Sequence, residues 1–480
     1  MLYASFAVNW TRCSPKFFKG DRLPCPHDFL TLDSQLSDSF ISSSRHSDVE
    51  YSICTPIPSF SKSSTPLSTL IDTCFSTSHS FAFIALKSNS TVYFGIDKFS
   101  KSSLLIFSNE SHVLFSSFIP SFLSATSALA VTVSPGIYSL DLSTGHVSIF
   151  LYPPPPPLPS IPSFDPLNPP HSLTELAQIF LEKFYQSIQQ SFMIDTSPSR
   201  HHCHVLFSGG IDSTLVAYHC AKYISDNKLK TVLSLYNVYF ASDAPDKLTA
   251  IQSFNQLRKI YPKISINLIS RDFSVDEVSE LRNFGVKFCA PKSTVMDANI
   301  ATSLLAGFQL INEQIRPFQS NLNQSRDQSR DFDLVFMGQG ADELFIGYHR
   351  YKSVYSKFGE LALKKTAIDS LIALREGISR DVRVAQNCGF FLTFPFISDL
   401  VYGFALSIPH FYHLGHTNQS KSRDQSNLIG KVVIREAARL IGLDCVVDLP
   451  KRAIQFGSRA AKLFDSDKYF KGNEILDSNF

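Results

Sequence analysis

The sequence lacks several features that would assign it to common classes of protein. Its nine cysteines form no C-x-x-C pair, which argues against a disulfide framework and a zinc site, so we expect reduced thiols. No hydrophobic run has the length and purity of a membrane-spanning helix, and residues 1–8 lack the basic stretch of a signal peptide. The net charge of +2 predicts no surface for nucleic acid. We therefore expect a cytoplasmic protein with neither nucleic-acid nor membrane partners.

A proline-rich stretch divides the chain into two expected domains. With 480 residues, of which 44% are hydrophobic, the chain can bury two cores. Prolines concentrate in residues 151–171, which predicts a semi-rigid linker between a domain at 1–150 and a domain at 172–480. The alternative is a proline-rich ligand for a recognition module. Ser172 and Glu175 then form a capping box before an amphipathic pattern, so we expect the second domain to open on a helix packed against a sheet.

The most informative segment is V-L-F-S-G-G-I-D-S at residues 205–213, where an apolar strand runs into two glycines and a helix. Gly209 and Gly210 allow a sharp turn and close approach to a ligand, and the N–H groups of a helix start can bind phosphate oxygens. The G-x-x-x-x-G-K-[S/T] pattern is absent. This favours cleavage between the α and β phosphates of ATP over transfer of the γ phosphate.

Polar side chains in this loop add to the predicted phosphate site. Ser208 and Ser213 can donate hydroxyl hydrogen bonds, and Asp212 can hold a Mg²⁺ ion that bridges phosphates. The alternative is an ordinary strand–turn–helix in which Asp212 or Ser213 only caps the helix.

A second segment of the same design follows much later in the chain. The apolar strand D-L-V-F at 333–336 leads into M-G-Q-G-A-D-E-L-F-I-G-Y at 337–348. Ligands of open parallel α/β sheets lie beyond the carboxyl ends of the strands, so both turns can face one nucleotide. Asp212 and Asp342 would then be paired Mg²⁺ ligands. The alternative is that Asp342 and Glu343 are only favourable charges at a helix start.

Three further motifs make the sequence similar to a known family. They are A-P-D at 244–246, F-P-F at 394–396 and L-P-K-R-A-I-Q-F-G-S at 449–458. With the two glycine turns, they resemble the synthetase domain of the asparagine synthetase family, in a divergent branch, over most of residues 173–463.

The resemblance implies an α/β fold, chemistry and ligands. The fold is a parallel-sheet domain of the pyrophosphate-loop, adenine nucleotide alpha hydrolase-like type. The activity is an ATP-dependent ligase that forms an aspartyl-adenylate and then asparagine, with Mg²⁺ as cofactor and ATP, aspartate and ammonia or glutamine as small-molecule partners. The residues implied to lie near the adenine and the start of the phosphates are Phe207, Val238, Met337 and Gly338.

The N-terminal domain resembles the glutaminase domain of the same family. Alternating apolar runs predict strands at 81–86, 92–96 and 103–107, similar to paired strands of that domain. The implied fold is a degenerate class II glutamine amidotransferase-like, N-terminal-nucleophile α+β domain.

The chemistry of such a glutaminase is not found in the sequence. Its nucleophile is a cysteine whose own α-amino group is the general base, whereas position 2 is Leu2 and both Cys13 and Cys25 are internal. These cysteines resemble buried small hydrophobic residues. We therefore expect nitrogen to come from free ammonia or from another protein, rather than from glutamine hydrolysed by this chain.

The synthetase domain departs from the family at two positions. Gln339 stands where the family has a glutamate assigned to acid/base work, and an amide cannot take a proton near pH 7. Ala453 stands where a pyrophosphate-binding lysine is expected; Lys451 or Arg452 could supply the charge, or both could lie in a solvated basic turn. These changes favour a competing hypothesis, a nucleotide-binding protein without turnover. A third, adenylation of RNA, is weakened by the near-neutral charge.

Other polar residues have simpler interpretations. Arg380, Asp381 and Arg383 could face the amino-acid substrate by resemblance, or form a surface ion-pair cluster. The related polar repeats at 323–331 and 418–427 predict solvated loops. Three histidines precede the first strand, remote from its carboxyl end, and we expect them to be structural or solvent-facing; they are His201, His202 and His204.

Overall fold

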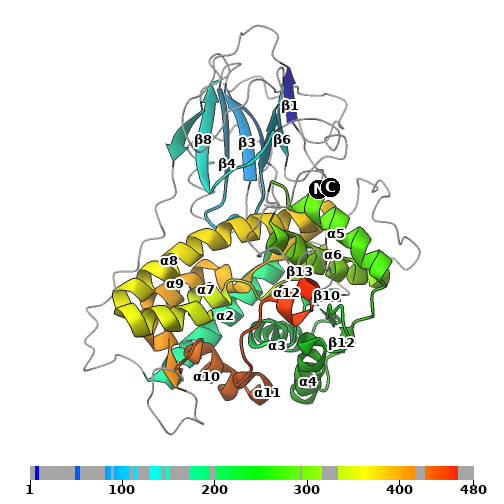
Figure 1. The fold of residues 1–480 in the computed structure, drawn as a ribbon, viewed down its shortest axis with the longest axis vertical. Coiled ribbons are helices and arrows are strands. Elements are labelled where there is room, and N and C mark those ends of the chain that lie inside the picture. The colour runs from blue at the N-terminus through cyan, green and yellow to red at the C-terminus, as the bar shows by residue number, and fades with distance from the viewer. Residues whose placement is uncertain are drawn as a thin grey trace.

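A computed structural model describes most of the second domain and parts of the first (Figure 1). The described residues are 6–9, 49–53, 82–87, 91–108, 112–116, 129–141, 147–151, 172–194, 202–291, 294–315, 333–416 and 428–462. The features predicted from sequence that lie outside these residues are Leu2, Cys13, Cys25, His201, both polar repeats and the linker beyond residue 151.

The described N-terminal strands form two antiparallel sheets. The first has the order β1-β6-β5-β7 and the second the order β2-β3-β4-β8-β9. Their bounds are β1 Phe6–Asn9, β2 Val49–Ile53, β3 Ala82–Lys87, β4 Thr91–Ile96, β5 Leu105–Ser108, β6 His112–Ser116, β7 Leu129–Thr132, β8 Gly136–Asp141 and β9 Val147–Leu151. Phe94 and Tyr138 of the second sheet share a buried cluster with Leu104 and Val133 beside the first. The sheets therefore pack on each other, and the three predicted strands coincide with β3, β4 and β5 to within two residues.

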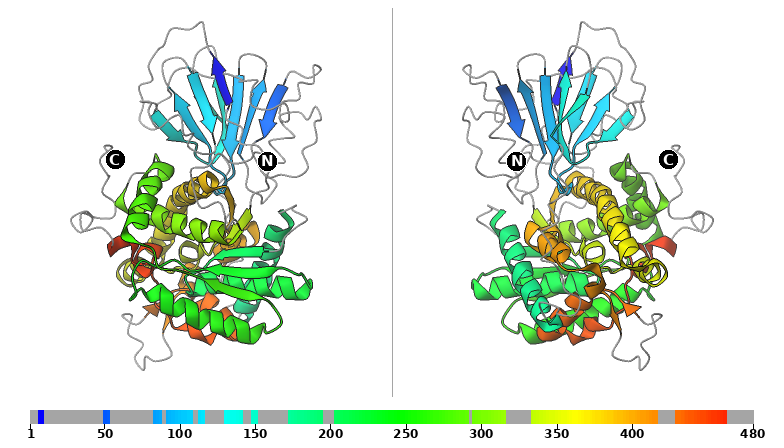
Figure 2. Two further views of the ribbon diagram at one scale, coloured as in Figure 1. Left: turned by 90° about the vertical axis from the view of Figure 1, so that its right-hand side faces the viewer. Right: turned by 90° about the vertical axis from the view of Figure 1, so that its left-hand side faces the viewer.

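The second domain is built on a parallel sheet with the order β12-β11-β10-β13-β14. Its strands are β10 His202–Leu206, β11 Val232–Tyr236, β12 Ile266–Ile269, β13 Asp333–Phe336 and β14 Phe390–Thr393. All four pairings are parallel. Taken in chain order the strands run 3-2-1-4-5, the arrangement of a doubly wound sheet, and helices lie on both of its faces (Figure 2). The predicted α/β class with a parallel sheet is confirmed.

Most of the described second domain is helical. The α-helices are α2 Leu173–Ile194, α3 Ile211–Asp226, α4 Pro245–Ile260, α5 Val275–Cys289, α6 Val295–Ile315, α7 Ala341–Leu344, α8 His349–Cys388, α9 Asp399–Ser407, α10 Val432–Leu440, α11 Asp444–Val447 and α12 Ile454–Gly457. Short 3-10 helices are η3 Pro395–Ile397, η4 His410–His413 and η6 Ala460–Lys462, and β15 Gly415–His416 pairs with β16 Leu428–Ile429. The long α8 bends at Gly359, whose φ of 76° is not helical.

Helix α2 begins as the sequence predicts and packs on other helices as well as on the sheet. Ser172 N–H donates to Glu175 Oε2 at 2.7 Å and Glu175 N–H donates to Ser172 Oγ at 3.2 Å, which completes the capping box. The helix packs mainly on α10, α9 and α3, while Phe192 near its end reaches Phe336 of β13 at 5.2 Å between ring centroids. Ser191 Oγ also lies 2.9 Å from Thr393 Oγ1 of β14. The expected packing against the sheet is therefore found at the end of the helix, and the rest of its apolar stripe is covered by other helices.

One turn of the N-terminal domain contacts the second domain. Phe99, after β4, is buried in the core of the second domain and meets Tyr402 of α9 with ring centroids 4.9 Å apart. Lys98 Nζ lies 2.5 Å from Asp399 Oδ1. The Asp97 carboxylate accepts the N–H groups of Phe99, Lys101 and Ser102 at 2.9–3.0 Å, which fixes the shape of this turn.

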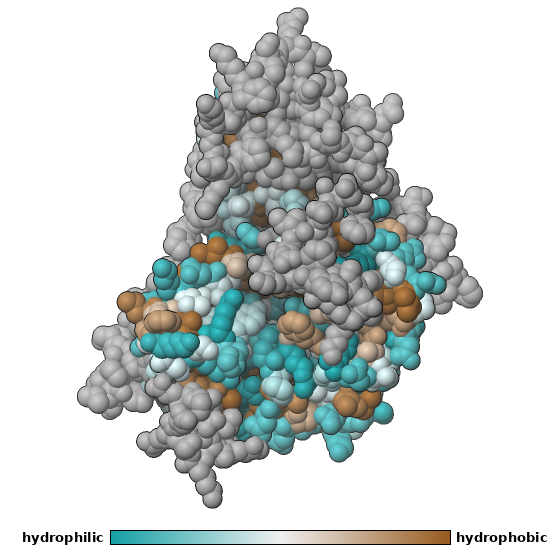
Figure 3. Space-filling view, viewed as in Figure 1, coloured by the Kyte–Doolittle hydropathy of each residue, from teal (hydrophilic) through white to brown (hydrophobic). Residues whose placement is uncertain are grey.

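The described surface is mixed in polarity, as Figure 3 shows. Its exposed apolar side chains include Phe358 and Leu361 of α8. Within the described residues, no helix combines the length and the apolar character needed to cross a membrane.

Candidate nucleotide site

Two glycine turns meet at the centre of the parallel sheet. One follows β10 and the other follows β13, and these adjacent strands connect onward to opposite sides of the sheet. Such a switch point opens a crevice for ligands in doubly wound folds. The turns touch, since a Cβ atom added to Gly338 would lie 3.0 Å from the backbone nitrogen of Ser213. The structure thus brings the two sequence motifs together.

Helix α4 fixes the first turn from behind. Gly209 has a φ of +74°, and a Cβ atom there would lie 2.3 Å from the backbone nitrogen of Ala250. Thr249 Oγ1 donates to the carbonyl of Ser208 at 2.9 Å, and Ser253 Oγ donates to the carbonyl of Gly209 at 2.8 Å. Only glycine fits this close approach, and the two hydroxyl bonds hold the turn in one conformation.

The start of α3 is left without a side-chain cap. The N-cap residue is Gly210, and no side chain caps it. Ser208 and Ser213 bond each other, with 3.2 Å between their Oγ atoms, and Gly210 N–H donates to Ser208 Oγ at 3.3 Å. Asp212 and Ser213 lie inside the helix, so the interpretation of either as its cap is wrong. The uncapped N–H groups of the first turn are those that bind anions at helix starts.

The second turn is equally constrained. Gly340 has a φ of +94°, and a Cβ atom there would lie 2.5 Å from Ile397 Cγ1. The following helix, α7, buries the side chains of Asp342 and Glu343, and Tyr348 donates its hydroxyl to Glu343 Oε1 at 2.5 Å. Burial of both acids argues against a role limited to surface charge at a helix start.

A lysine that the motifs do not include joins the two turns. Lys431 Nζ lies 2.7 Å from both oxygens of Asp212 and 2.8 Å from Asp342 Oδ1. Its side chain is 3% exposed, and its φ of 63° bends the chain just before α10. The carboxylates of Asp212 and Asp342 therefore converge on one point, which the ammonium group occupies.

Burial and ion pairing shift the pKa values of this group in different directions. Burial raises the pKa of Asp212 despite the nearby Lys431. Burial also acts on Asp342, but Lys431 and Lys451 outweigh it and lower the pKa of this carboxyl. Burial opposes the charge of Lys431, yet the two carboxylates raise its pKa. Lys431 is thus held as a cation, and Asp342 is the more firmly ionised of the two acids.

The C-terminal motif contributes one of its two predicted cations directly. Lys451 Nζ lies 2.5 Å from Asp342 Oδ2, with its side chain 27% exposed. Arg452 is exposed to solvent, and Ala453 is the N-cap residue of α12. The solvated-turn interpretation therefore suits Arg452, whereas Lys451 is part of the ion-pair group that links the turns.

Gln339 belongs to a second, separate buried cluster. Its side-chain amide donates to Asp381 Oδ2. Asp381 also accepts from Arg380 Nε at 2.7 Å, and Arg380 NH1 lies 2.6 Å from Asp297 Oδ1. Arg383 lies nearby and donates to the carbonyl of Cys289 at 3.1 Å. The arginines and aspartates are nearly inaccessible to solvent, so the surface ion-pair interpretation of this cluster is wrong.

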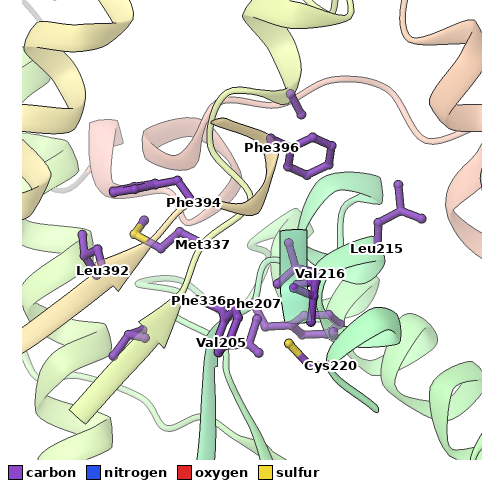
Figure 4. Packing of buried hydrophobic residues seen from close by; sticks show 14 of the residues in the cluster. Val205, Phe207, Leu215, Val216, Cys220, Phe336, Met337, Leu392, Phe394 and Phe396 are labelled. Atoms are coloured by element: carbon purple, nitrogen blue, oxygen red, sulfur yellow. The ribbon is translucent and has the colours of Figure 1, made fainter. Parts of the chain in front are cut away.

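The side chains expected near adenine face the protein core. Phe207 and Met337 are 2% and 4% exposed, and they pack with Val205, Phe336 and Phe394 beneath the turns (Figure 4). Their side chains are therefore part of the core. Val238 is half-buried. The histidine expectation agrees with the structure for the two described residues, as His202 is exposed and His204 is buried with Nδ1 3.0 Å from the hydroxyl of Tyr236.

The donor set fits the implied Mg²⁺ ion. Two carboxylates converge on one cation position, and carboxylate oxygens are ligands that Mg²⁺ accepts. Among the described residues no group of three or more His, Cys, Asp or Glu side chains is placed to hold a metal. Mg²⁺ usually keeps several waters and completes its shell with substrate phosphates, so Asp212 and Asp342 are sufficient, provided that Lys431 moves aside or pairs with phosphate instead.

The fold and site define a doubly wound α/β protein with a predicted phosphate crevice. Comparison with known proteins shows which of them the chain is similar to. No protein-family model matches the chain. An asparagine synthetase domain-containing protein of Saccharomyces cerevisiae is 30% identical over 292 residues, covering 57% of this chain and 50% of its own. Asparagine synthetase domain-containing protein 1 is 26% identical in Gallus gallus, over 56% of this chain and 47% of its own. The protein of that name in Homo sapiens is 25% identical, over 58% and 48%.

These homologues confirm the resemblance to a divergent asparagine synthetase-like family that the motifs indicated. The chain spans about half the length of the curated relatives it matches.

Proposed function

We propose that the protein is an asparagine synthetase-like ligase that activates aspartate with ATP and releases AMP and pyrophosphate. The observation that carries the proposal is the meeting of an uncapped helix start at Gly210 with the converging carboxylates of Asp212 and Asp342. The first binds phosphate oxygens and the second binds a divalent cation. The names of the homologues support the same chemistry.

In the proposed first step, the turn after β10 and the start of α3 hold the phosphates, while Lys431 and Lys451 balance the phosphate charge. A side-chain carboxylate oxygen of aspartate forms a bond to the α phosphorus, and the bond from that phosphorus to the bridging oxygen breaks. Pyrophosphate leaves, held by the N–H groups of Ser208 to Ser213 and by Lys451. Mg²⁺ between Asp212 and Asp342 would neutralise developing negative charge on the phosphates. Such charge stabilisation is the largest contribution in many enzymes.

In the second step ammonia forms a bond to the acyl carbon, and the acyl–phosphate bond breaks to release AMP. The nitrogen gives up a proton, which Gln339 cannot accept because it is an amide. We propose free ammonia as the nitrogen source. The packed antiparallel sheets of the N-terminal domain are compatible with a degenerate glutaminase-like fold of class II type.

A second candidate function is nucleotide binding without turnover. The observation that favours it is the bond from Gln339 to Asp381. It ties the amide into a buried cluster rather than leaving a carboxylate free to exchange protons.

The test is the release of AMP and pyrophosphate from Mg-ATP by the purified protein, with aspartate and ammonium and then with glutamine. Asp212→Ala, checked for folding by its thermal transition, is the control. Turnover that requires aspartate, ammonium and Asp212 supports the ligase. ATP binding without AMP formation under every donor condition would overturn it and leave the binding protein.

A further inference from the structure

A third carboxylate lies at the edge of the same site without a partner. Asp246 stands in the first turn of α4, and it is 7% exposed. Neither of its carboxylate oxygens has a hydrogen-bonding partner among the described residues. The two oxygens are therefore left for a ligand or for water. Burial raises its pKa to about 7, against the opposing effect of Arg452 and Lys451.

The main chain of Asp246 is tied to the first glycine turn. The side-chain Nδ2 of Asn237 donates to the carbonyl of Phe207 at 2.9 Å and to that of Asp246 at 3.3 Å. Thr249 Oγ1 makes a similar bridge, since it lies 2.9 Å from the carbonyl of Ser208 and 3.3 Å from that of Asp246. The main chain at the start of α4 is therefore held next to the end of β10, on the side of β11.

The chain leaves space for this carboxylate on its other side. A Cβ atom on Gly457, the last residue of α12, would lie 2.2 Å from Asp246 Oδ2 and 2.3 Å from Oδ1. The adjoining segment is anchored by the carbonyl of Ser458, which accepts from Phe240 N–H at 2.9 Å. Because residue 457 is a glycine, the Asp246 carboxylate fits beside it. Gly457 donates no hydrogen bond to this carboxylate.

The chemistry of a fitting ligand group follows from what surrounds the carboxylate. A phosphate would be repelled, because both groups are anionic acceptors. A cationic amine is disfavoured, because Arg452 and Lys451 already supply positive charge. Neutral hydroxyl donors satisfy the oxygens without adding charge, and the two oxygens of one carboxylate match two neighbouring hydroxyls. Carboxylates that follow a strand of a nucleotide-binding sheet bind ribose in this way.

We propose that Asp246 binds the vicinal hydroxyls of the ribose of the nucleotide. The inference rests on nucleotide binding at this site, as proposed above, and not on turnover. It adds a specificity residue on the β11 side of the phosphate turn, and it explains why a buried carboxylate without a partner is tolerated there. The role is one of binding, because the hydroxyls take no part in the bonds that change.

The experiment measures binding of ATP, 2′-deoxy-ATP and 3′-deoxy-ATP by calorimetry in the presence of Mg²⁺. The wild-type protein should bind each deoxy analogue about tenfold or more weakly than ATP, the usual effect of losing a hydrogen bond to a charged group. Asp246→Ala should weaken ATP binding by a similar factor and bind all three nucleotides alike. Asp243→Ala is the matched control, since this neighbouring carboxylate is 69% exposed and pairs with Arg459; it should retain the discrimination.

Folding is expected to survive, because removing a buried carboxylate without a partner relieves a desolvation cost. Gly457→Ala provides an independent variant, in which the added methyl group displaces the carboxylate and should also abolish the discrimination. Purine riboside triphosphate tests whether the carboxylate binds the adenine amino group instead.

The outcomes separate this inference from the proposed ligase activity. Discrimination that disappears in Asp246→Ala supports it, even where AMP formation is absent. Undiminished discrimination in that variant overturns it alone, as does a penalty confined to purine riboside triphosphate. Failure of the wild-type protein to bind any of the nucleotides overturns both proposals.

Discussion

Substitution of Gly209 by alanine gives a direct test of how the phosphate turn is held. A residue other than glycine in the left-handed region costs about 1–2 kcal/mol. The added Cβ atom would also lie 2.3 Å from the nitrogen and 2.4 Å from the Cα of Ala250. Both neighbours are backbone atoms of α4, so the conflict can be relieved only by moving the turn or the helix.

Gly442 provides a control with the same backbone conformation. Its φ is also +74°, but a Cβ atom there would meet nothing within 4 Å. Gly442→Ala therefore measures the conformational cost alone. The difference between the two variants isolates the contact of the turn with α4, which we expect to add about 1–3 kcal/mol, as overpacking does.

The assay is thermal unfolding followed by ATP binding. A loss of 1 kcal/mol lowers Tm by about 2–4 °C in domains of 150–250 residues. Gly442→Ala should therefore lower Tm by a few degrees and bind ATP normally. Gly209→Ala should lower it about twice as far and weaken ATP binding at least tenfold, because the N–H groups of the turn no longer point at one ligand. Equal changes in Tm, or unaltered ATP binding in Gly209→Ala, would refute the reasoning.

Three further predictions concern buried charged, polar and titratable side chains. Lys431→Met leaves Asp212 unpaired and Asp342 paired with Lys451 alone, so the folding free energy should fall by about 3–5 kcal/mol, and thermal scans should show that Mg²⁺ restores more stability to this variant than to the wild type. Gln339→Glu places a carboxylate against Asp381 and should lower the urea midpoint, whereas the double variant with Asp381→Asn restores a donor–acceptor pair and should recover it; equal midpoints would contradict this.

Stability should also fall on acidification, because burial lowers the pKa of several histidines to about 4 or below, while their unfolded value is near 6.5. The unfolded chain takes up protons between these values that the folded chain does not, so stability is complete above pH 6.5 and is lost as pH falls toward 4; a urea midpoint that is constant over this window would show the assignment to be wrong. The histidines are His204, His219, His410 and His413.

The parts that sequence predicts well are those whose determinants are local. The turn after β10 and the turn after β13 are predictable from the sequence as apolar strands followed by glycines. In both, the strand, the turn and the helix start are consecutive in the chain. Their meeting followed from a general property of parallel sheets. The capping box at Ser172 is similarly local, since its two partners are three residues apart.

The parts that sequence misses depend on partners far along the chain. Lys431 pairs with Asp212 across 219 positions, and its only local signal is a G-K step before a helix. Burial of Arg380 and Asp381 follows from how α6 and α8 pack, which a charged segment does not reveal. The side chains of Phe207 and Met337 turn toward the core, although the resemblance to the family implied a place near adenine.

The cluster around Gln339 leads to a last prediction, on the pH dependence of turnover. Asp297 and Asp381 balance Arg380 and Arg383, and Gln339 adds no charge to this buried group. A carboxylate at 339 would be a third negative charge beside Asp381, so the amide matches its surroundings, and no titratable group stands at this position.

The attacking nitrogen must therefore be deprotonated before it reacts, or lose its proton to water. AMP formation with ammonium should then rise steadily from pH 6.5 to pH 9 without a plateau near neutrality, in contrast to the bell-shaped profile of a site with its own acid and base. A plateau near pH 7 would mean that another side chain accepts the proton. The Gln339→Glu, Asp381→Asn double variant, which places a carboxylate at 339 without changing the net charge of the cluster, should gain such a plateau.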